Sequence, residues 1–288
     1  MDGYDARLSI AGTGAPLVLV PGMDGTGALF YRQVPHLSAA GYRVATWALR
    51  DEAPSMDVLV GDLDEVVRAV SAPGGAAGAT ATRGDEGAIV VGESFGGALA
   101  LSYALAHPER VRRLVILNSF PCFEPQFRLH LAIAGLHAMP WGAMRLVRRV
   151  TGARLHSRHT HADDIREFRR LIARATRRGY VGRLRILTQY DVRDRLADIR
   201  VPTLFLASDQ DHLVPAVAQA LEMSARVPHA SMRVLAGHGH ICLIAPDLNL
   251  ATILSDWADA PRAVPSPAAV PSGPAAPLTA PPASSTSG

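Results

Sequence analysis

The sequence predicts an α/β fold in which a mostly parallel sheet is covered by helices on both faces. Short, nearly continuous apolar runs alternate with helix-like segments, which is the pattern of buried parallel strands. Between the fourth and fifth runs, about eighty residues of helical character interrupt this alternation. A serine between two glycines, Gly92-Glu-Ser-Phe-Gly96, also joins a strand-like run to an Ala/Leu-rich run, as in a sharp strand-to-helix turn.

Six segments share a short length and a high content of apolar and β-branched residues, and these are the predicted strands. They are Leu17–Val20, Tyr42–Trp47, Ala88–Val91, Leu114–Leu117, Thr203–Leu206 and Met232–Leu235. Helical segments fill the intervals, so each strand reaches the next by a crossover, as a parallel sheet requires.

The long helical interval predicts a cap inserted into the sheet domain. Within it, the segment Asp163–Arg178 begins with acidic residues and ends with arginines, which suits the dipole of a helix. A helix over this segment places five apolar residues on one face: Ile165, Phe168, Leu171, Ile172 and Ala175. We therefore expect an α/β core of residues 1–120 and 200–260, a helical cap of residues 121–199, and a disordered Pro/Ala/Ser-rich tail of residues 261–288.

The composition is that of a soluble globular protein with one sizeable core. Of 288 residues, 48% are hydrophobic and 19% are charged. No apolar run has the length of a membrane span, and the N-terminus lacks the basic-then-apolar order of a signal peptide, so we expect a cytoplasmic protein without a transmembrane segment. The two cysteines, Cys122 and Cys242, are too few for a disulfide framework or a metal cluster.

The basic residues are all arginines, and they gather between Pro121 and Arg200, although the formal net charge is only +3. Two interpretations stay open: a surface for an anionic substrate or a membrane, or a solvated helical insertion. No motif and no aromatic interleaving indicates binding to nucleic acid. The sequence leaves the oligomeric state undecided.

Ser94 is the predicted nucleophile. A serine held in a strained backbone conformation at a tight turn has room only if the residues two before and two after it lack a side chain, and Gly92 and Gly96 meet this condition. The order of strand, glycine-bounded serine and helix predicts a nucleophile elbow.

A serine hydroxyl becomes a good nucleophile when a histidine takes its proton and a carboxylate orients that histidine. Candidates follow the last two predicted strands: Asp209 and Asp211 after the first, His238 and His240 after the second. These loops lie at the carboxyl ends of parallel strands, where ligands and catalytic groups gather. Spacing by itself leaves both acids and both histidines open, and Asp209 is also suited to bonding its own turn.

Over about residues 7 to 258, the chain resembles the serine hydrolases of the α/β-hydrolase fold. The matching pieces are a Leu-Val-Leu-Val-Pro-Gly loop, the Gly-Glu-Ser-Phe-Gly-Gly elbow, an Asp-x-x-Val-Pro loop and a Gly-His pair before the final helix. The resemblance implies Ser94 as nucleophile, Asp211 as acid and His240 as base, with the final helix starting from Ile241 onward. We expect neither a cofactor nor a metal.

The resemblance also implies an oxyanion hole formed by two backbone N–H groups, those of Met23 and Phe95. Many relatives carry His-Gly where this chain has Pro21-Gly22, although only the backbone donor is needed. The stretch Pro21–Gly27 with the Gly-Glu-Ser motif also resembles the acyltransferase-like hydrolases that include plant phytyl ester synthases. That second resemblance implies an ester or thioester of a hydrophobic acyl chain.

The expected function is hydrolysis of a carboxylic ester or thioester, through an acyl-enzyme, on a small or acyl-chain substrate. Three alternatives remain: an acyltransferase that uses the same acyl-enzyme, a metal site made by the two acids and the two histidines, and a non-catalytic binding protein on a hydrolase scaffold. The segments Phe120–Phe127 and Leu136–Trp141 carry aromatic and Met side chains that either line an apolar acyl pocket or pack within the cap.

Overall fold

The computed structural model describes residues 8–72, 87–124, 126–138 and 155–259. Within these residues, seven strands form one sheet in the order β1-β3-β2-β4-β5-β6-β7. The strands are β1 (Ser9–Ala11), β2 (Ala15–Val20), β3 (Tyr42–Thr46), β4 (Ala88–Glu93), β5 (Val111–Leu117), β6 (Thr203–Ser208) and β7 (Ala230–Leu235). Every neighbouring pair is parallel except β1 and β3, which are antiparallel. The predicted α/β fold with a mostly parallel sheet is confirmed.

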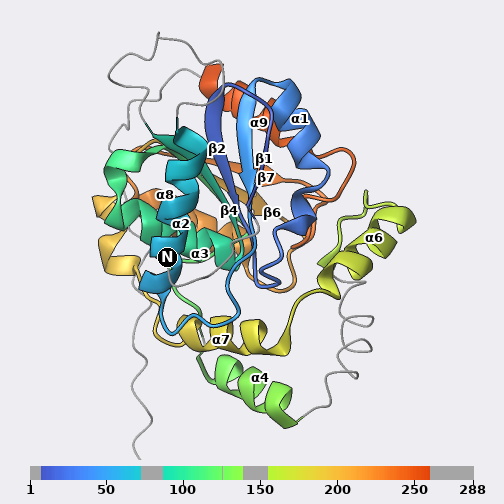
Figure 1. Ribbon diagram of the computed structural model, residues 1–288. Helices are drawn as coiled ribbons and strands as arrows, with labels where there is room; N and C mark the ends of the chain where they lie inside the picture. Colours follow the sequence, from blue (N-terminus) through green and yellow to red (C-terminus); the bar gives the residue numbers. More distant parts are fainter. Residues whose placement is uncertain (1–7, 73–86, 125, 139–154, 260–288) are drawn as a thin grey trace, which may run out of the picture.

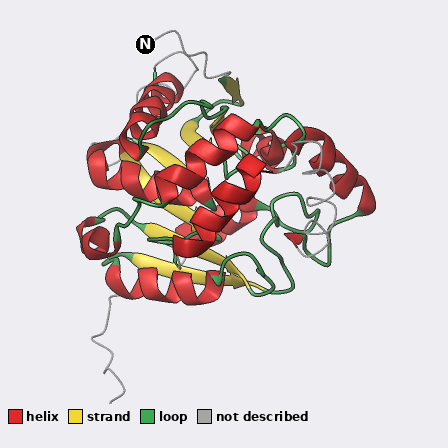
Figure 2. Cartoon of the chain, turned by 90° about the horizontal axis from the view of Figure 1, so that it is seen from below, coloured by secondary structure: helices red, strands yellow, loops and turns green. Residues whose placement is uncertain are grey.

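Helices cover both faces of this sheet (Figures 1 and 2). The covering helices are α1 (Gln33–Ala39), α2 (Met56–Ser71), α3 (Phe95–Ala106), α8 (Ala216–Arg226) and α9 (Leu250–Asp259). Three further helices lie beyond one end of the sheet (Figure 1): α4 (Gln126–Ala138), α6 (Ala162–Ile172) and α7 (Arg177–Leu187). Short 3-10 segments are η1 (Ala28–Phe30), η2 (Pro108–Arg110) and η4 (Arg193–Asp198).

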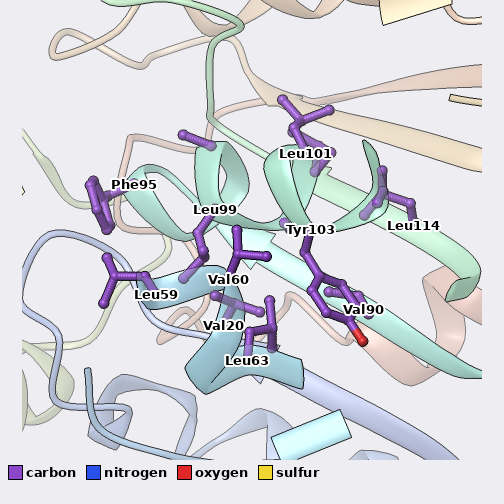
Figure 3. Close-up of a cluster of buried hydrophobic side chains, with 14 of the residues drawn as sticks. Val20, Leu59, Val60, Leu63, Val90, Phe95, Leu99, Leu101, Tyr103 and Leu114 are labelled. Atoms are coloured by element: carbon purple, nitrogen blue, oxygen red, sulfur yellow. The ribbon is translucent and has the colours of Figure 1, made fainter. Parts of the chain in front are cut away.

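Alternating side chains of the strands build two hydrophobic clusters, one on each face of the sheet. Along β2, Val18 and Val20 point into the cluster formed with α2, α3 and α8, whereas Leu17 and Leu19 point into the cluster formed with α1 and α9. Burial of these apolar side chains is the main stabilising contribution to the fold, and it fixes the strand ends that carry the site. Figure 3 shows the first cluster, with labelled side chains of α2, α3 and the strands: Val20, Leu59, Val60, Leu63, Val90, Phe95, Leu99, Leu101, Tyr103 and Leu114.

The predicted strands match the observed ones except at their ends and at β1. Strand β4 continues past Val91 to Glu93, and the N–H of Ser94 still donates to the carbonyl of Leu117 at 2.9 Å. The sheet therefore supports the chain up to the serine itself. The sequence pattern does not reveal β1, because three residues at a sheet edge are too few to show an alternation.

One predicted helix is wrong in its extent, because the segment Asp163–Arg178 is not a single helix. Helix α6 ends at Ile172, where the N–H groups of Arg174 and Ala175 turn back onto the last carbonyls of the helix. Helix α7 then begins with its own cap, in which the hydroxyl of Thr176 accepts from the N–H of Gly179 at 3.0 Å. Local capping by threonine outweighs the continuous apolar pattern.

The expectation that the final helix starts from Ile241 onward is also wrong, because α9 begins at Leu250. The carboxamide of buried Gln33 donates to the carbonyls of Leu243 and Leu248 and accepts from the N–H of Leu250. These bonds provide partners for backbone polar groups of the irregular loop before α9, which is buried in the hydrophobic cluster formed with α1 and α9. Asn249 caps the helix, because its Oδ1 accepts from the N–H groups of Ala251 and Thr252.

Two predictions lie outside the described residues: the disordered tail of residues 261–288, and the role of Met139 and Trp141 in an acyl pocket or in cap packing. Within the described residues, no helix has the length and apolar character needed to cross a membrane. Cys122 is half-buried, Cys242 is buried, and both are free thiols.

Candidate active site

The turn between β4 and α3 has the geometry of a nucleophile elbow. Ser94 has φ 55° and ψ −119°, a conformation that residues with side chains rarely adopt and that costs on the order of 1–3 kcal/mol. A Cβ atom at Gly92 would lie 2.3 Å from the carbonyl oxygen of Gly96, and one at Gly96 would lie 2.3 Å from the carbonyl oxygen of Val20. These clashes explain the two flanking glycines, as the sequence predicts.

The structure brings Ser94, His240 and Asp211 into one hydrogen-bonded chain. The Oγ atom of Ser94 lies 3.0 Å from Nε2 of His240, and Nδ1 of His240 lies 2.7 Å from Oδ2 of Asp211. Because a carboxylate only accepts, Nδ1 carries the proton and Nε2 is free to accept the proton of the serine hydroxyl. The His240 side chain is 6% exposed and that of Asp211 is fully buried, so the chain of bonds is shielded from water.

The two candidate acids have separate roles in the structure. Oδ1 of Asp211 accepts from the N–H groups of Leu213 and Val214, which leaves Oδ2 for the histidine. Asp209 instead accepts from the N–H of Gly237 at 2.7 Å, and so ties the two loops together. The interpretation that Asp209 bonds its own turn is therefore wrong, since Asp211 makes the local turn.

The second candidate histidine, His238, turns away from the serine. Its Nδ1 lies 2.7 Å from the hydroxyl of Ser157, and its Nε2 lies 3.7 Å from a carboxylate oxygen of Asp247. Burial lowers the pKa of His238, although the Asp247 charge opposes this. Within the described residues, no group of three or more His, Cys, Asp or Glu side chains has the arrangement of a metal site.

The two predicted oxyanion donors belong to two segments that meet near Ser94. Phe95 is the first residue of α3, so its N–H is one of the helix N–H groups without an intrahelical acceptor. Strands β2 and β4 are neighbours, with Val20 opposite Gly92, and this places the loop after β2 beside the elbow. A Cβ atom at Gly22, next to Met23, would lie 3.7 Å from Cβ of Ser94.

Asn118 is a site residue that the sequence analysis does not identify. It is buried at the end of β5, and its φ of 47° lies in the left-handed region that asparagine tolerates. Its amide donates to the carbonyl of His240 at 2.9 Å and to the hydroxyl of Ser208 at 2.9 Å, and its oxygen accepts from the N–H of Ser208 at 2.8 Å. Its position directly after a predicted strand, next to the elbow strand, is the signal that would have found it.

Glu93 is a buried carboxyl group directly before Ser94. Burial is the main cause that raises its pKa to about 7; the charge of His240 opposes this shift, and the carboxylates of Asp24 and Asp211 contribute to it. Glu93 therefore changes charge near neutral pH, within the electrostatic field of the hydrogen-bonded chain. The sequence shows this residue only as a variable position of the elbow motif.

The apolar residues proposed to line an acyl pocket divide between core and surface. Phe120 is buried and stacks edge-on against Phe123 at 5.1 Å and against Tyr190 at 6.4 Å. Leu136 is buried as well, whereas Phe127 is 65% exposed. Most of the described aromatic residues of these segments therefore take part in packing.

The chain has relatives of known family in both sequence and fold. The family model described as alpha/beta hydrolase fold matches residues 79–245. A protein named as a carbamate hydrolase, RutD, of Azorhizobium caulinodans is 31% identical over 263 residues, which cover 85% of this chain and 93% of that protein. The pimeloyl-[acyl-carrier protein] methyl ester esterase of Yersinia enterocolitica is 28% identical over 179 residues, which cover 59% of this chain and 69% of the esterase.

Among solved structures, the esterase EaEST of Exiguobacterium antarcticum has a TM-score of 0.75 at 18% identity, and the match covers 88% of this chain and 95% of that chain. At this identity the likeness concerns the fold. The family match and the sequence relatives, together with the observed sheet and elbow, show that this chain belongs to the α/β hydrolase fold family and is a hydrolase.

Proposed function

We propose that this chain is a serine hydrolase that cleaves a carboxylic ester or thioester through an acyl-enzyme. The observation that carries the proposal is the hydrogen-bonded chain from Ser94 through His240 to Asp211, at 3.0 and 2.7 Å. The order nucleophile, base and orienting acid is the arrangement that activates a serine hydroxyl.

In the first half of the reaction, Oγ of Ser94 attacks the carbonyl carbon while Nε2 of His240 takes the hydroxyl proton. Asp211 keeps the histidine in the correct tautomer and stabilises the imidazolium that forms. The N–H groups of Met23 and Phe95 bind the oxyanion of the tetrahedral intermediate. The intermediate collapses when His240 gives its proton to the departing alkoxide or thiolate, which leaves an acyl ester on Ser94.

In the second half, His240 removes a proton from water, and the resulting hydroxide attacks the acyl ester. The same two N–H groups bind the second oxyanion, and the proton on His240 returns to Oγ of Ser94 as the acid leaves. Neither half requires a cofactor or a metal.

We propose that the substrate is a small or acyl-chain molecule and that residues 121–199 form a cap over the reacting serine. The names of two relatives, a carbamate hydrolase and a methyl ester esterase, support a substrate with a small group on one side of the carbonyl. Helices α4 and α7 of this segment lie beyond the end of the sheet that carries the elbow (Figure 1), which supports the division into core and cap.

The test combines a fluorophosphonate probe with a panel of p-nitrophenyl esters of increasing acyl length. Wild-type protein is expected to gain one phosphonyl group on Ser94, located by mass spectrometry, and to hydrolyse the short esters. Ser94→Ala is expected to remain unlabelled and to lose roughly 10⁴- to 10⁶-fold in kcat. Wild-type protein that neither reacts with the probe nor turns over any ester, carbamate or thioester would refute the proposal.

Two further arms separate the alternative functions. Added alcohol shifts the product from free acid to a new ester only if the acyl-enzyme prefers an alcohol over water, as in an acyltransferase. Exhaustive chelation leaves the activity of a serine hydrolase unchanged, whereas loss of activity that added metal restores would favour the metal site.

A further inference from the structure

The guanidinium of Arg183, in α7, reaches the loop that follows β2. Arg183 is only 2% exposed, which is rare for a charged side chain. Its Nε donates to the carbonyl of Met23 at 2.9 Å, and one terminal nitrogen donates to the carbonyl of Asp24 at 3.2 Å. Residues 160 positions apart in the sequence are thus joined at the loop that carries a proposed oxyanion donor.

Two glycines make room for this guanidinium. A Cβ atom at Gly25 would lie 2.7 Å from Cζ of Arg183, and one at Gly179 would lie 2.9 Å from a terminal nitrogen of the same side chain. Gly25 also has φ +68°, so a side chain there would be strained as well as obstructed. The shape of the loop and the position of the guanidinium depend on each other.

The contacts fix the direction of the Met23 N–H. That N–H shares its peptide group with the carbonyl of Gly22, which accepts from the N–H of Gly25 at 3.0 Å. In a planar trans peptide the N–H points opposite to the C=O, so this turn bond aims the Met23 N–H away from the turn. Arg183 holds the next two carbonyls and thereby keeps the turn from opening.

We propose that Arg183 is a positioning residue that holds the loop Gly22–Gly25 in the shape required for an oxyanion donor. The inference rests on the proposed function, because it assigns a purpose to the Met23 N–H in that reaction. An oxyanion exists only in the transition state and intermediates, so a misplaced donor lowers kcat more than it raises KM.

The test compares Arg183→Met with Arg185→Met, a variant of an exposed arginine on the same helix. We expect Arg183→Met to lower kcat for a short p-nitrophenyl ester by roughly 10- to 100-fold, with KM changed by less than about threefold. We expect Arg185→Met to match wild type in both constants. Hydrogen exchange of a peptide spanning residues 21–27 should be faster in Arg183→Met only.

Arg183→Lys is a second variant that tests the same inference if Arg183→Met does not fold. An ammonium keeps the charge but lacks the planar fork that reaches two carbonyls, so kcat should fall by at least about threefold while the melting temperature stays close to that of Arg185→Met. A kcat within twofold of Arg185→Met for every folded Arg183 variant, or unchanged exchange of the loop, would overturn the inference.

The two proposals fail in distinguishable ways. If wild-type protein shows no hydrolysis and no labelling, the proposed function fails, whereas hydrogen exchange still reports whether Arg183 orders the loop. If wild-type protein is active and the folded Arg183 variants keep both its kcat and its loop protection, only the inference about Arg183 fails.

Discussion

The side-chain amide of Asn118 donates to the main-chain carbonyl of His240 at 2.9 Å and so joins the end of β5 to the histidine loop. The same side chain bonds Ser208 through both its oxygen and its nitrogen, at the end of the strand that leads to Asp211. One buried amide therefore sets the spacing of the two loops that carry the proposed base and the proposed acid.

Replacement of Asn118 by aspartate tests this role. The change keeps the shape but replaces a donor by a carboxylate oxygen facing the carbonyl of His240, so the bond becomes a repulsion. We expect the free energy of unfolding to fall by about 1–3 kcal/mol and kcat to fall by roughly tenfold or more, because the histidine loop shifts. Urea denaturation and steady-state kinetics measure the two effects.

Asn118→Gly is the matched control for backbone strain, since glycine accepts a φ of 47° without penalty. It removes the amide bonds without adding repulsion, so its kcat should lie between those of wild type and Asn118→Asp. A kcat equal to wild type in both variants would show that the amide does not position the site.

A pair of alanine variants tests which of the two histidines, His238 or His240, acts as the base. His240→Ala removes the group within 3.0 Å of the nucleophile, and kcat should fall by roughly 10⁴- to 10⁶-fold. His238→Ala removes only the bonds to Ser157 and Asp247, and kcat should stay within about tenfold of wild type. Steady-state kinetics on one short ester decides the matter, and the reverse order of effects would identify His238 as the base.

The two acids are compared as asparagine variants, which preserve size and one acceptor oxygen. Asp211→Asn keeps the local turn bonds but presents an amide that favours the wrong tautomer of His240, so kcat should fall by roughly 10³- to 10⁴-fold. Asp209→Asn still accepts from the N–H of Gly237, so kcat should change by less than about threefold. Equal losses in the two variants would contradict the assignment of Asp211.

Because the pKa of buried Glu93 is raised, we expect the stability of the protein to depend on pH. Burial raises its pKa from 4.5 in the unfolded chain to about 7 in the folded protein. The folded state then binds the proton more tightly, so the contribution to stability is complete below pH 4.5 and is lost as the pH rises toward 7. The shift corresponds to about 3 kcal/mol in the free energy of unfolding.

Glu93→Gln removes this titration. We expect the variant to be more stable than wild type at pH 8, by an amount that shrinks as the pH falls toward 4.5. Urea denaturation at several pH values from 5 to 8 measures the difference between the two proteins and cancels the other titrating groups. Parallel stability curves for the two proteins would rule out a raised pKa for Glu93.

Much of the fold follows from the sequence, because apolar runs, crossover segments and the glycines around Ser94 are local signals. Each predicted strand is observed, and the strain at the serine requires the glycines that flank it. Helix ends are harder to predict from the sequence, because individual hydrogen bonds determine them. Here these bonds involve the caps at Thr176 and Asn249 and the buried Gln33.

The sequence by itself determined the α/β order of elements, the elbow and a short set of candidate acids and bases. Only the tertiary structure decided how these candidates pair: Asp211 faces His240, while Asp209 and His238 bond other partners. The two residues that hold the site from outside the motifs, Asn118 and Arg183, also emerge only in three dimensions. The physical reason is that hydrogen-bond direction and burial depend on contacts between segments far apart in the chain, which no local pattern encodes.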